Sequence, residues 1–436
     1  MKYLVFWLSL AGVPLLAKVL SLNHRWMRWA FFGMIAGLYF YQGTAINFLS
    51  REHYTGTARG MEVSLLHLLA LAVLLAWAVR GKREPLLPEG GIRIYAAYFL
   101  LCLPGLLNAD DLLVGWFEVW KMLLLFVFWH AMYAYLRATD DVGTVVKALA
   151  FFAVANCFLV LKQHYAWGMY QAVGVFPIWN SLGAAMNLLG GLFFAGYLQL
   201  GPRDRLGALC TVAFAGTAAS AVWSYSRAAI ATMPVAYVLA ALGVLAGARR
   251  KKQVLRRLSP MAVAALAGLC MAWGNIAERF LHAPKQSGET RKEMAVCARE
   301  MIREHPFAGV GINNCSLNMQ DDHPYRERAE GKMGKPIGAG GVVETLYLLV
   351  GAECGIPAAL ALLAWFGWHA AVCWKAAWRL RGTEWLFVPA GLAGGISANA
   401  LQGILDWALR QPMNLFLLVS CFAMAAHLSG KKRDAA

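Results

Sequence analysis

The feature that most constrains this chain is a succession of apolar runs, each long enough to cross the hydrocarbon core of a membrane. About thirteen runs occur, near residues 3–21, 27–49, 61–79, 92–107, 113–136, 143–162, 181–200, 206–224, 227–247, 259–277, 357–378, 384–404 and 412–429. Helices of this length satisfy their own backbone hydrogen bonds in lipid. With 59% hydrophobic and only 15% charged residues, the sequence predicts an all-α, polytopic membrane helical bundle of about 12 to 13 transmembrane helices.

Basic residues set the expected orientation, because loops rich in Lys and Arg stay on the cytoplasmic side. Four clusters follow the third, ninth, eleventh and last runs: Arg80, Lys82, Arg83 and Arg93; Arg249, Arg250, Lys251, Lys252, Arg256 and Arg257; Lys375, Arg379 and Arg381; and Lys431, Lys432 and Arg433. If every run spans, these clusters share one face, which we expect to be cytoplasmic, with the C-terminus. The first run has an alternative: because Met1 and Lys2 would face outward, it could lie in the interface and leave twelve crossings.

Charge and cysteine usage exclude several classes of protein. The net charge of +16 is largely accounted for by the four basic clusters, which would meet anionic lipid headgroups, so we expect membrane lipids and no nucleic acid as partners. No Cys and His set has zinc spacing and no phosphate-binding glycine loop occurs, so we predict no metal and no cofactor. Cys297 and Cys315 are either small core residues or, in an oxidising compartment, a disulfide.

A polar interruption divides the chain into three expected parts. These are an N-terminal transmembrane bundle over 1–277, an external loop over 278–341, and an interfacial helix with C-terminal transmembrane helices over 342–436. In the loop, the capping-box sequence 290–293 (Thr-Arg-Lys-Glu) predicts a helix that starts at Thr290. Apolar residues then recur at helical spacing until Pro306 ends the pattern. We expect this amphipathic helix to lie across the membrane surface or to pack on the bundle.

The apolar sequence from 342 to 379 is too long for one crossing. As a single helix it would run roughly 57 Å at 1.5 Å per residue, almost twice the hydrocarbon thickness. Gly355-Ile356-Pro357 predicts a break, with a short outer helix over 342–354 before the true span. Glu344 and Glu353 would then lie near the outer surface.

Several charged residues at the outer ends of the runs are candidates for chemistry. Arg227 lies where two apolar runs meet with almost no loop. It either snorkels to the interface or is a partly buried guanidinium that binds an anion. Further outward-facing groups could join it, namely Arg51 with Arg59 and Lys162 with His164. In the last outer loop we expect Asp406 and Arg410 to pair with each other.

Several converging arginines suit a diphosphate, because guanidinium donors match phosphate oxygens and keep their charge. Glu344 could act as a general base towards a hydroxyl. Its alternative is a carboxylate that is stabilised by the dipole at the start of a helix.

Four ordered blocks resemble the O-antigen ligase and polymerase superfamily of bacterial surface-polysaccharide enzymes. They are 224–229 (Ser-Tyr-Ser-Arg-Ala-Ala); Arg291 in the external helix; 305–314 (His-Pro-Phe-Ala-Gly-Val-Gly-Ile-Asn-Asn); and 344–349 (Glu-Thr-Leu-Tyr-Leu-Leu) with 353–357 (Glu-Cys-Gly-Ile-Pro). The resemblance covers roughly 220 to 360, and the rest only as a multispanning pattern. Many members carry His-Asn where Glu344-Thr345 stands here, which raises the possibility of a different acceptor or a lost activity.

The resemblance implies an enzyme of the bacterial inner membrane that works on the periplasmic face. Its donor would be an undecaprenyl-diphosphate-linked glycan and its acceptor a hydroxyl of the lipid A core or of another glycan, without a metal. We predict catalytic roles for Arg227, Arg291 and Glu344. The predicted substrate-binding residues are Arg51, Arg59, Lys162, His164, Asn313, Asn314 and Tyr347. If Glu344 is not the base, His305 and His323 are the next candidates.

Competing functions follow from the same sequence. One large external loop late in the chain favours a ligase over a surface or exopolysaccharide polymerase of the same superfamily. A transporter or flippase of a lipid-linked substrate would use the basic outer residues for binding alone. Transporters often show inverted repeats and broken helices at mid-membrane. The sequence shows no convincing repeat and its ionisable residues gather at the outer surface, so the enzyme is favoured.

Overall fold

The computed structural model describes residues 2–79, 91–261, 285–320, 323–338 and 341–430. Most of the expected span at 259–277 and two of the basic clusters, around 80–83 and at 431–433, lie outside the described residues. The helices and strands are α1 (Lys2–Leu22), α2 (His24–Ala36), η1 (Gly37–Phe40), α3 (Tyr41–Thr44), β1 (Ile46–Ser50), β2 (Gly60–Val63), α4 (Leu65–Val79), α5 (Gly91–Cys102), η2 (Leu103–Asn108), α6 (Leu112–Thr139), α7 (Val142–Leu161), η3 (Lys162–Ala166), α8 (Trp179–Gln199), α9 (Arg205–Trp223), α10 (Arg227–Gly247), α12 (Lys285–Glu304), η4 (Leu317–Met319), α13 (Pro324–Met333), α14 (Leu346–Arg379), η5 (Glu384–Leu386), α15 (Phe387–Gln402), η6 (Ala408–Arg410) and α16 (Pro412–Ser429).

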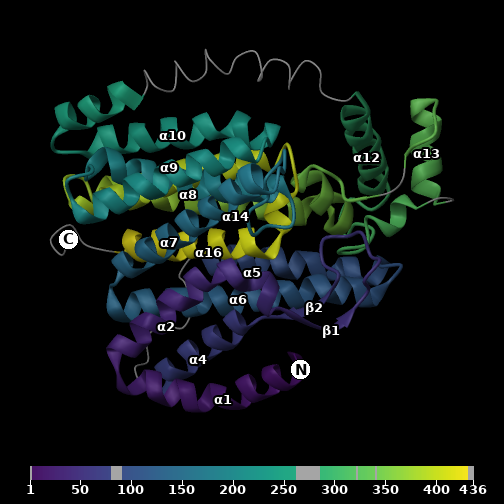
Figure 1. The fold of residues 1–436 in the computed structure, drawn as a ribbon. Coiled ribbons are helices and arrows are strands. Elements are labelled where there is room, and N and C mark those ends of the chain that lie inside the picture. Colours follow the sequence, from purple (N-terminus) through teal and green to yellow (C-terminus); the bar gives the residue numbers. More distant parts are fainter. Residues whose placement is uncertain (1, 80–90, 262–284, 321–322, 339–340, 431–436) are drawn as a thin grey trace.

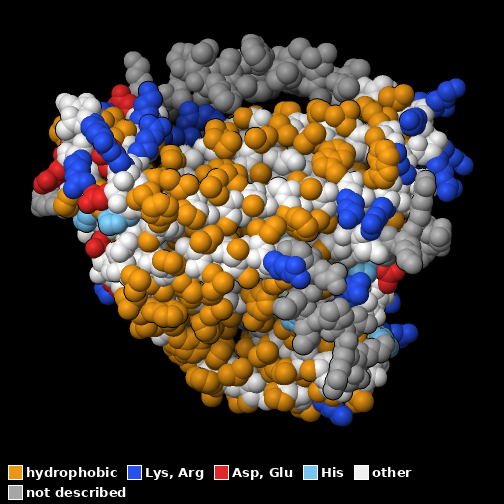
Figure 2. All heavy atoms as spheres, turned by 180° about the vertical axis from the view of Figure 1, so that it is seen from behind, with side chains coloured by type: hydrophobic (Ala, Val, Ile, Leu, Met, Phe, Trp, Pro, Cys, Tyr) orange, Lys and Arg blue, Asp and Glu red, His pale blue; other side chains and the backbone are white. Residues whose placement is uncertain are grey.

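The expected all-α membrane fold is confirmed. Within the described ranges, nine helices are long and apolar enough to cross a membrane, and α4 is a shorter apolar helix. Figure 1 shows the long helices side by side in one bundle, and Figure 2 shows a broad band of hydrophobic side chains between ends where charges gather. The most buried helix is α8, which packs against α9, α10 and α15. Many of its residues are small, and glycines let α8 and α15 approach closely, as at Gly191 and Gly391.

Basic residues that follow α10 and α14 lie at the same end of the bundle as the last residue of α16. The backbone N–H of Gly382, just after α14, donates to the carbonyl of Gly247 at 2.9 Å. The Arg379 guanidinium donates to the carbonyl of Ser429, the last residue of α16. In Figure 1 the last turn of α16 lies at this end of the bundle, and α12 and α13 lie at the opposite end. The described structure therefore separates the basic ends from the external segment, as the charge pattern predicts.

A short hairpin interrupts the N-terminal helices. The apolar run at 27–49 is helical only as far as Thr44, and β1 then pairs antiparallel with β2, with Ile46 opposite Val63 and Asn47 opposite Glu62. The backbone N–H of Arg51 donates to the carbonyl of Arg59 at 2.8 Å. The hairpin therefore brings together two arginines that are eight positions apart in the sequence.

The break predicted within 342–379 is present inside α14. Gly355 has φ +86°, and a Cβ there would lie 2.3 Å from the carbonyl oxygen of Phe307, so only glycine fits. The backbone N–H groups of Val310 and Gly311 donate to the carbonyls of Ala352 and Glu353 at 2.8 and 3.1 Å. The loop after α12 thus satisfies carbonyls that the break frees, and Glu353 is held at a fixed place.

The external segment forms a small core of its own on the first turns of α14. The helix α12 runs across the direction of the bundle helices (Figure 1) and packs against α13 and α14. It starts at Lys285, so the predicted start at Thr290 is wrong, whereas its end at Glu304 agrees with Pro306 as the stop. Its buried face includes Cys297 and Met301, which join Cys315 in that core. Both cysteines are free thiols, so the disulfide alternative is wrong in this structure.

Candidate functional site

Arg227 is the first residue of α10, at the end of the bundle that carries the external segment. Ser226 caps this helix, and its side chain donates to Oδ1 of Asn180 at 2.7 Å. Tyr225 before it has φ +49°, an unusual conformation for a residue with a side chain. Such strain is stored where surrounding contacts fix the backbone. The short connection between α9 and α10 is therefore rigid, and the half-buried Arg227 side chain starts from a fixed point.

A chain of hydrogen bonds leads from this cap to the end of α15. The side-chain amide of Gln402 donates to the Asn180 carbonyl at 3.4 Å and to Oδ2 of Asp406 at 2.9 Å. Its oxygen accepts from Thr232 at 3.3 Å, one turn beyond the start of α10. Gln402 is fully buried. One glutamine therefore connects the α10 terminus to the segment after α15.

Arg291 and Glu344, two of the predicted catalytic residues, form an ion pair. Nε of Arg291 lies 2.5 Å from Oε2 of Glu344, and both side chains are about one-third exposed. Glu344 lies just before α14, whose first residues are fixed on α15: the Leu346 N–H donates to the Gly403 carbonyl at 2.8 Å. The Tyr347 hydroxyl donates to the Ala400 carbonyl at 2.7 Å. The pair therefore lies beside the same end of α15 as Gln402.

Asp406 lies between the two arginine sites. Burial raises its pKa to about 6, although hydrogen bonds from Gln402 and from the backbone of Ala408, together with the positive charge of Arg291, lower it. The negative charge of Glu344 adds to the rise. The charges of both members of the ion pair therefore act on the Asp406 carboxyl. The predicted pairing of Asp406 with Arg410 is wrong, because Asp406 accepts from Gln402 and Ala408 instead.

The raised pKa of Asp406 predicts a loss of stability as pH rises. The folded carboxyl holds its proton up to about pH 6, whereas its ordinary value is 3.8. The protonated Asp406 carboxyl therefore stabilises the folded state fully below pH 4, and this contribution is lost as pH rises through 6. For this group alone, the free energy of unfolding should fall by about 3 kcal/mol. Asp406→Asn should flatten the change in unfolding midpoint between pH 4.5 and 7.5 in detergent, and the exposed Glu52→Gln should follow the wild type. If the unfolding midpoints of Asp406→Asn and the wild type change identically with pH, the raised pKa does not belong to Asp406.

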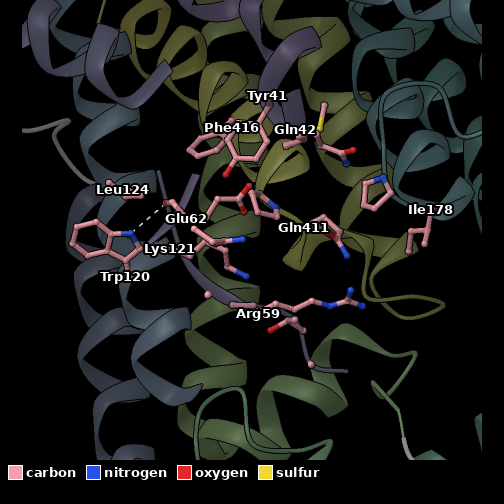
Figure 3. Close-up of a pocket in the computed structure, with 18 of the residues that line it drawn as sticks. Tyr41, Gln42, Arg59, Glu62, Trp120, Lys121, Leu124, Ile178, Gln411 and Phe416 are labelled. Atoms are coloured by element: carbon pink, nitrogen blue, oxygen red, sulfur yellow. Dashed lines mark hydrogen bonds between the residues drawn. The ribbon is translucent and has the colours of Figure 1, made fainter. Parts of the chain in front are cut away.

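A cavity of about 470 Å³ opens next to this chain of contacts (Figure 3). Its wall includes Ile178, two residues before Asn180, and Trp407, directly after Asp406. The hairpin contributes Arg59 and Glu62, and α6 contributes Lys121. Aromatic rings and side-chain amides complete the wall: Tyr41, Gln42, Trp120, Gln411 and Phe416. The cavity has the volume typical of small-molecule sites, roughly 300–1,000 Å³.

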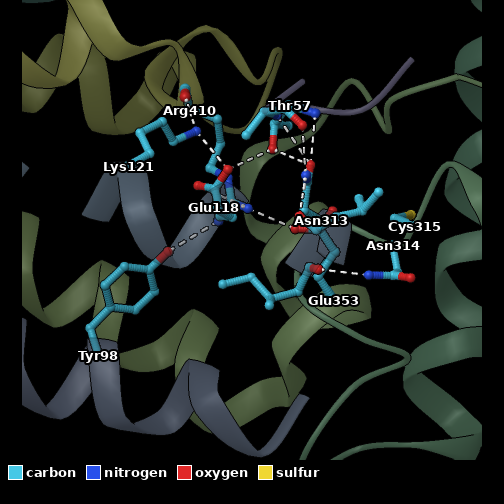
Figure 4. A network of polar contacts seen from close by, with 12 residues as sticks. Thr57, Tyr98, Glu118, Lys121, Asn313, Asn314, Cys315, Glu353 and Arg410 are labelled. Carbon is cyan, nitrogen blue, oxygen red and sulfur yellow. Dashed lines mark hydrogen bonds and ion pairs between the residues drawn. The ribbon is translucent and has the colours of Figure 1, made fainter. Parts of the chain in front are cut away.

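A buried cluster of four charges that the sequence did not reveal shares Lys121 with the wall of the cavity (Figure 4). The Arg410 guanidinium lies 2.8 Å from Glu353 and 3.3 Å from Glu118. Lys121 lies 2.7 Å from Glu118 and donates to the Arg410 carbonyl at 2.8 Å. All four residues are less than a tenth exposed. Two carboxylates and two cations balance, so the cluster joins α6, α14 and η6 without a net charge.

Asn313 and Asn314 fix the loop after α12 to the N-terminal half. The Asn313 side chain accepts from the Thr57 N–H at 2.9 Å and donates to the carbonyls of Ala58 and Val114. The Asn314 side chain accepts from the Asp111 N–H at 2.9 Å. Both asparagines are fully buried. Both side-chain amides therefore hold the loop in position. The predicted role of Asn313 and Asn314 in substrate binding stays a prediction.

The remaining predicted residues lie on different parts of the outer end. Arg51 pairs with Asp111 at 2.7 Å and lines a different cavity from the one that Arg59 lines. Lys162 and His164 lie in the π-helical turn η3, where Lys162 covers the Trp167 ring and His164 contacts the Met169 carbonyl at 3.0 Å.

Of the two alternative bases, His305 follows α12 directly and is half-buried. His323 stacks on Tyr325 and lies 3.8 Å from Asp110.

Sequence reasoning missed Glu118, Lys121 and Glu62 as members of these groups. A signal for the first two was present, because an acidic and a basic residue three positions apart inside an apolar run are neighbours on one helix face. In the described residues, no group of three His, Cys, Asp or Glu side chains is arranged to hold a metal ion. The outer end of the bundle thus carries the Arg227 and Arg291 side chains, the Glu344 carboxylate beside Arg291, and a cavity with polar lining residues.

Residues 211–363 match the family model described as O-antigen ligase. This region starts in α9 and ends in α14, so it contains Arg227, Arg291 and Glu344. No curated protein matches the chain.

Proposed function

We propose, from the premise that residues 211–363 belong to the O-antigen ligase superfamily, that this chain transfers a glycan from undecaprenyl diphosphate to an acceptor hydroxyl on the periplasmic face of the bacterial inner membrane. The family match supports a membrane glycosyltransferase of the ligase or polymerase type that acts on lipid-linked glycans. We propose the ligase, with the lipid A core as acceptor, because one large polar segment lies late in the chain. The proposed reaction uses no metal.

The observation that carries this proposal is the connection between Arg227 and the Arg291 and Glu344 pair. Successive hydrogen bonds join Ser226, Asn180, Gln402 and Asp406, and the charges of Arg291 and Glu344 act on the Asp406 carboxyl. Together, the Arg227 and Arg291 guanidinium groups would suit the two phosphates of a lipid diphosphate, since each offers planar paired donors. Negative charge grows on that diphosphate as it leaves, and fixed cations stabilise such charge most in a site that excludes water.

The ion pair also suggests an order of events. In the free protein, the charge of Arg291 is neutralised by Glu344 at 2.5 Å. A diphosphate carries more negative charge than a carboxylate, so donor binding would draw the guanidinium away and free the Glu344 carboxylate. The acceptor hydroxyl oxygen then attacks the anomeric carbon of the donor sugar, and Glu344 takes the hydroxyl proton. The bond from that carbon to the phosphate oxygen breaks, and its electron pair leaves with undecaprenyl diphosphate.

The test is transfer by the purified protein in lipid nanodiscs that contain a lipid-linked oligosaccharide and a lipid A core acceptor. We expect release of undecaprenyl diphosphate together with an equal increase in acceptor mass. If the glycan instead grows on the lipid carrier, the proposed function changes from ligase to polymerase. Donor binding without any product, across acceptors, would contradict the proposal and favour a transporter.

Glu344→Gln should separate chemistry from donor binding. Loss of the general base should lower kcat by about 10²–10⁴-fold, whereas donor affinity should stay equal or increase, because Arg291 no longer has an anionic partner to leave. The measurements are single-turnover transfer and equilibrium binding of the lipid-linked donor. Glu289→Gln, on the exposed side of α12, is the matched control and should behave as the wild type. An unchanged kcat in Glu344→Gln would assign the base to another residue.

A further inference from the structure

The cavity of about 470 Å³ is lined by two polar groups without a partner among the described residues, a buried nitrogen of His67 and the half-buried carboxylate of Glu62. Nδ1 of His67 accepts from the Ser64 N–H at 2.9 Å, so in the neutral ring the proton is on Nε2. That Nε2 has no hydrogen-bond partner among the described residues, although His67 is only 4% exposed and lines the cavity. Buried donors are normally satisfied, so an acceptor on a molecule bound in the cavity that His67 lines would supply the missing partner.

The complementary group is the carboxylate of Glu62, on the hairpin strand just before His67. Its side chain forms no hydrogen bond or ion pair with the described residues, and it also lines the cavity (Figure 3). Burial raises the pKa of Glu62, while Lys121 lowers it. An acceptor and a donor that lie in one cavity match a hydroxyl group, which can accept from the histidine and donate to the carboxylate.

The rest of the wall fits a molecule that carries many hydroxyls on apolar rings. The indole N–H of Trp120 donates to the Glu62 carbonyl at 3.2 Å, which fixes this ring beside the carboxylate. The Tyr41 and Phe416 rings pack edge-on or tilted against His67 and each other. Among these rings lie the amides of Gln42 and Gln411 (Figure 3), which supply both donors and acceptors.

We propose that this cavity is a saccharide-binding subsite, in which Glu62 and His67 share one sugar hydroxyl and Trp120 supports the sugar ring. The inference rests on the proposed glycan transfer, and it names the part of the site that recognises sugar rather than diphosphate. Trp407 and Ile178 place the cavity beside the residues that connect Arg227 with Asp406. The sugar belongs either to the acceptor or to the donor glycan.

Binding of lipid-free glycans tests the subsite without requiring transfer. The probes are the core oligosaccharide released from lipopolysaccharide and the oligosaccharide released from the lipid-linked donor, each titrated calorimetrically into the full chain in nanodiscs. We expect one probe to bind and Glu62→Gln to weaken it at least tenfold. Binding of the core probe identifies the acceptor subsite, and binding of the other identifies the donor subsite. Failure of both probes to bind at millimolar concentration overturns the inference.

Matched variants exclude a general loss of structure. Glu52→Gln changes an exposed glutamate in the same hairpin loop and should bind as the wild type. Trp120→Phe should weaken binding, whereas Trp116→Phe, one turn earlier on α6 and 44% exposed, should not. The transfer assay separates the subsite proposal from the proposed function. Glu62→Gln should raise KM for the glycan that binds. If the wild type transfers glycan but Glu62→Gln leaves the KM values for donor and acceptor unchanged, the subsite proposal is rejected and the proposed function stands. If a probe binds but no transfer occurs, the subsite stands and the proposed function fails.

Discussion

Arg227→Ala is expected to lower the rate of glycan transfer by at least about a hundredfold while the protein inserts and folds normally. Removing one fixed donor from a site where negative charge develops lowers kcat by about 10²–10³-fold. The helix itself should persist, because Ser226 and not Arg227 provides the cap of α10. Transfer is measured in nanodiscs at matched protein abundance, with the unfolding midpoint as the check on folding.

Two further variants sharpen this test. Arg227→Lys keeps the charge but loses the paired planar donors, so its rate should fall between those of the wild type and Arg227→Ala. Arg205→Ala is the matched control, because Arg205 is also the first residue of a helix after a side-chain cap, here Asp204 at the start of α9. It should transfer at the wild-type rate. Full activity of Arg227→Ala would mean that the guanidinium only snorkels to the interface.

Arg410→Ala should cause the largest loss of stability of any single substitution considered. Arg410 is 3% exposed and lies between two buried carboxylates, Glu118 and Glu353. Removing one partner from a buried charge network lowers the free energy of unfolding by about 3–5 kcal/mol, because the remaining charge is left uncompensated. The unfolding midpoint and the yield of folded protein in detergent measure this loss.

A second substitution should recover part of the lost stability. Arg410→Met with Glu353→Gln removes one charge of each sign and leaves Glu118 with Lys121, so this double variant should be more stable than Arg410→Ala. Arg328→Ala is the surface control, because Arg328 pairs with Glu304 in an exposed position, where ion pairs contribute little. If Arg410→Ala is as stable as Arg328→Ala, the cluster is not a structural requirement.

The sequence predicted best those features that depend on nearby residues. The expected run at 227–247 coincides with α10 because the length of an apolar run in lipid sets the length of the helix. The break in α14 was predictable because glycine and proline act on the local backbone. The start of α12 was not, since a capping-box pattern also fits inside a helix. In the structure the helix already begins at Lys285, so residues 290–293 lie inside it.

Features built from distant residues were harder to predict. Arg410 was expected to pair with Asp406, four residues away, but its partners are 57 and 292 positions distant in the chain. Glu344 and Arg291 were each selected for their own chemistry, and their ion pair emerges only when α12 packs beside the start of α14. The hairpin that holds Glu62 depends on pairing between short strands, which carry a weak signal in an otherwise apolar region.

The charge cluster has a consequence for the synthesis of the chain. Glu118 and Lys121 are three positions apart, so each of these charges emerges from the ribosome with its partner close in the chain. Glu353 follows, and its cation, Arg410, emerges 57 residues later, a delay of roughly three to eleven seconds at about 5–20 residues per second. During this interval the carboxyl group has to remain protonated or stay in contact with water. Translation that stalls before codon 410 therefore leaves a nascent protein with an acidic group it cannot bury, a defect that quality-control proteases could recognise.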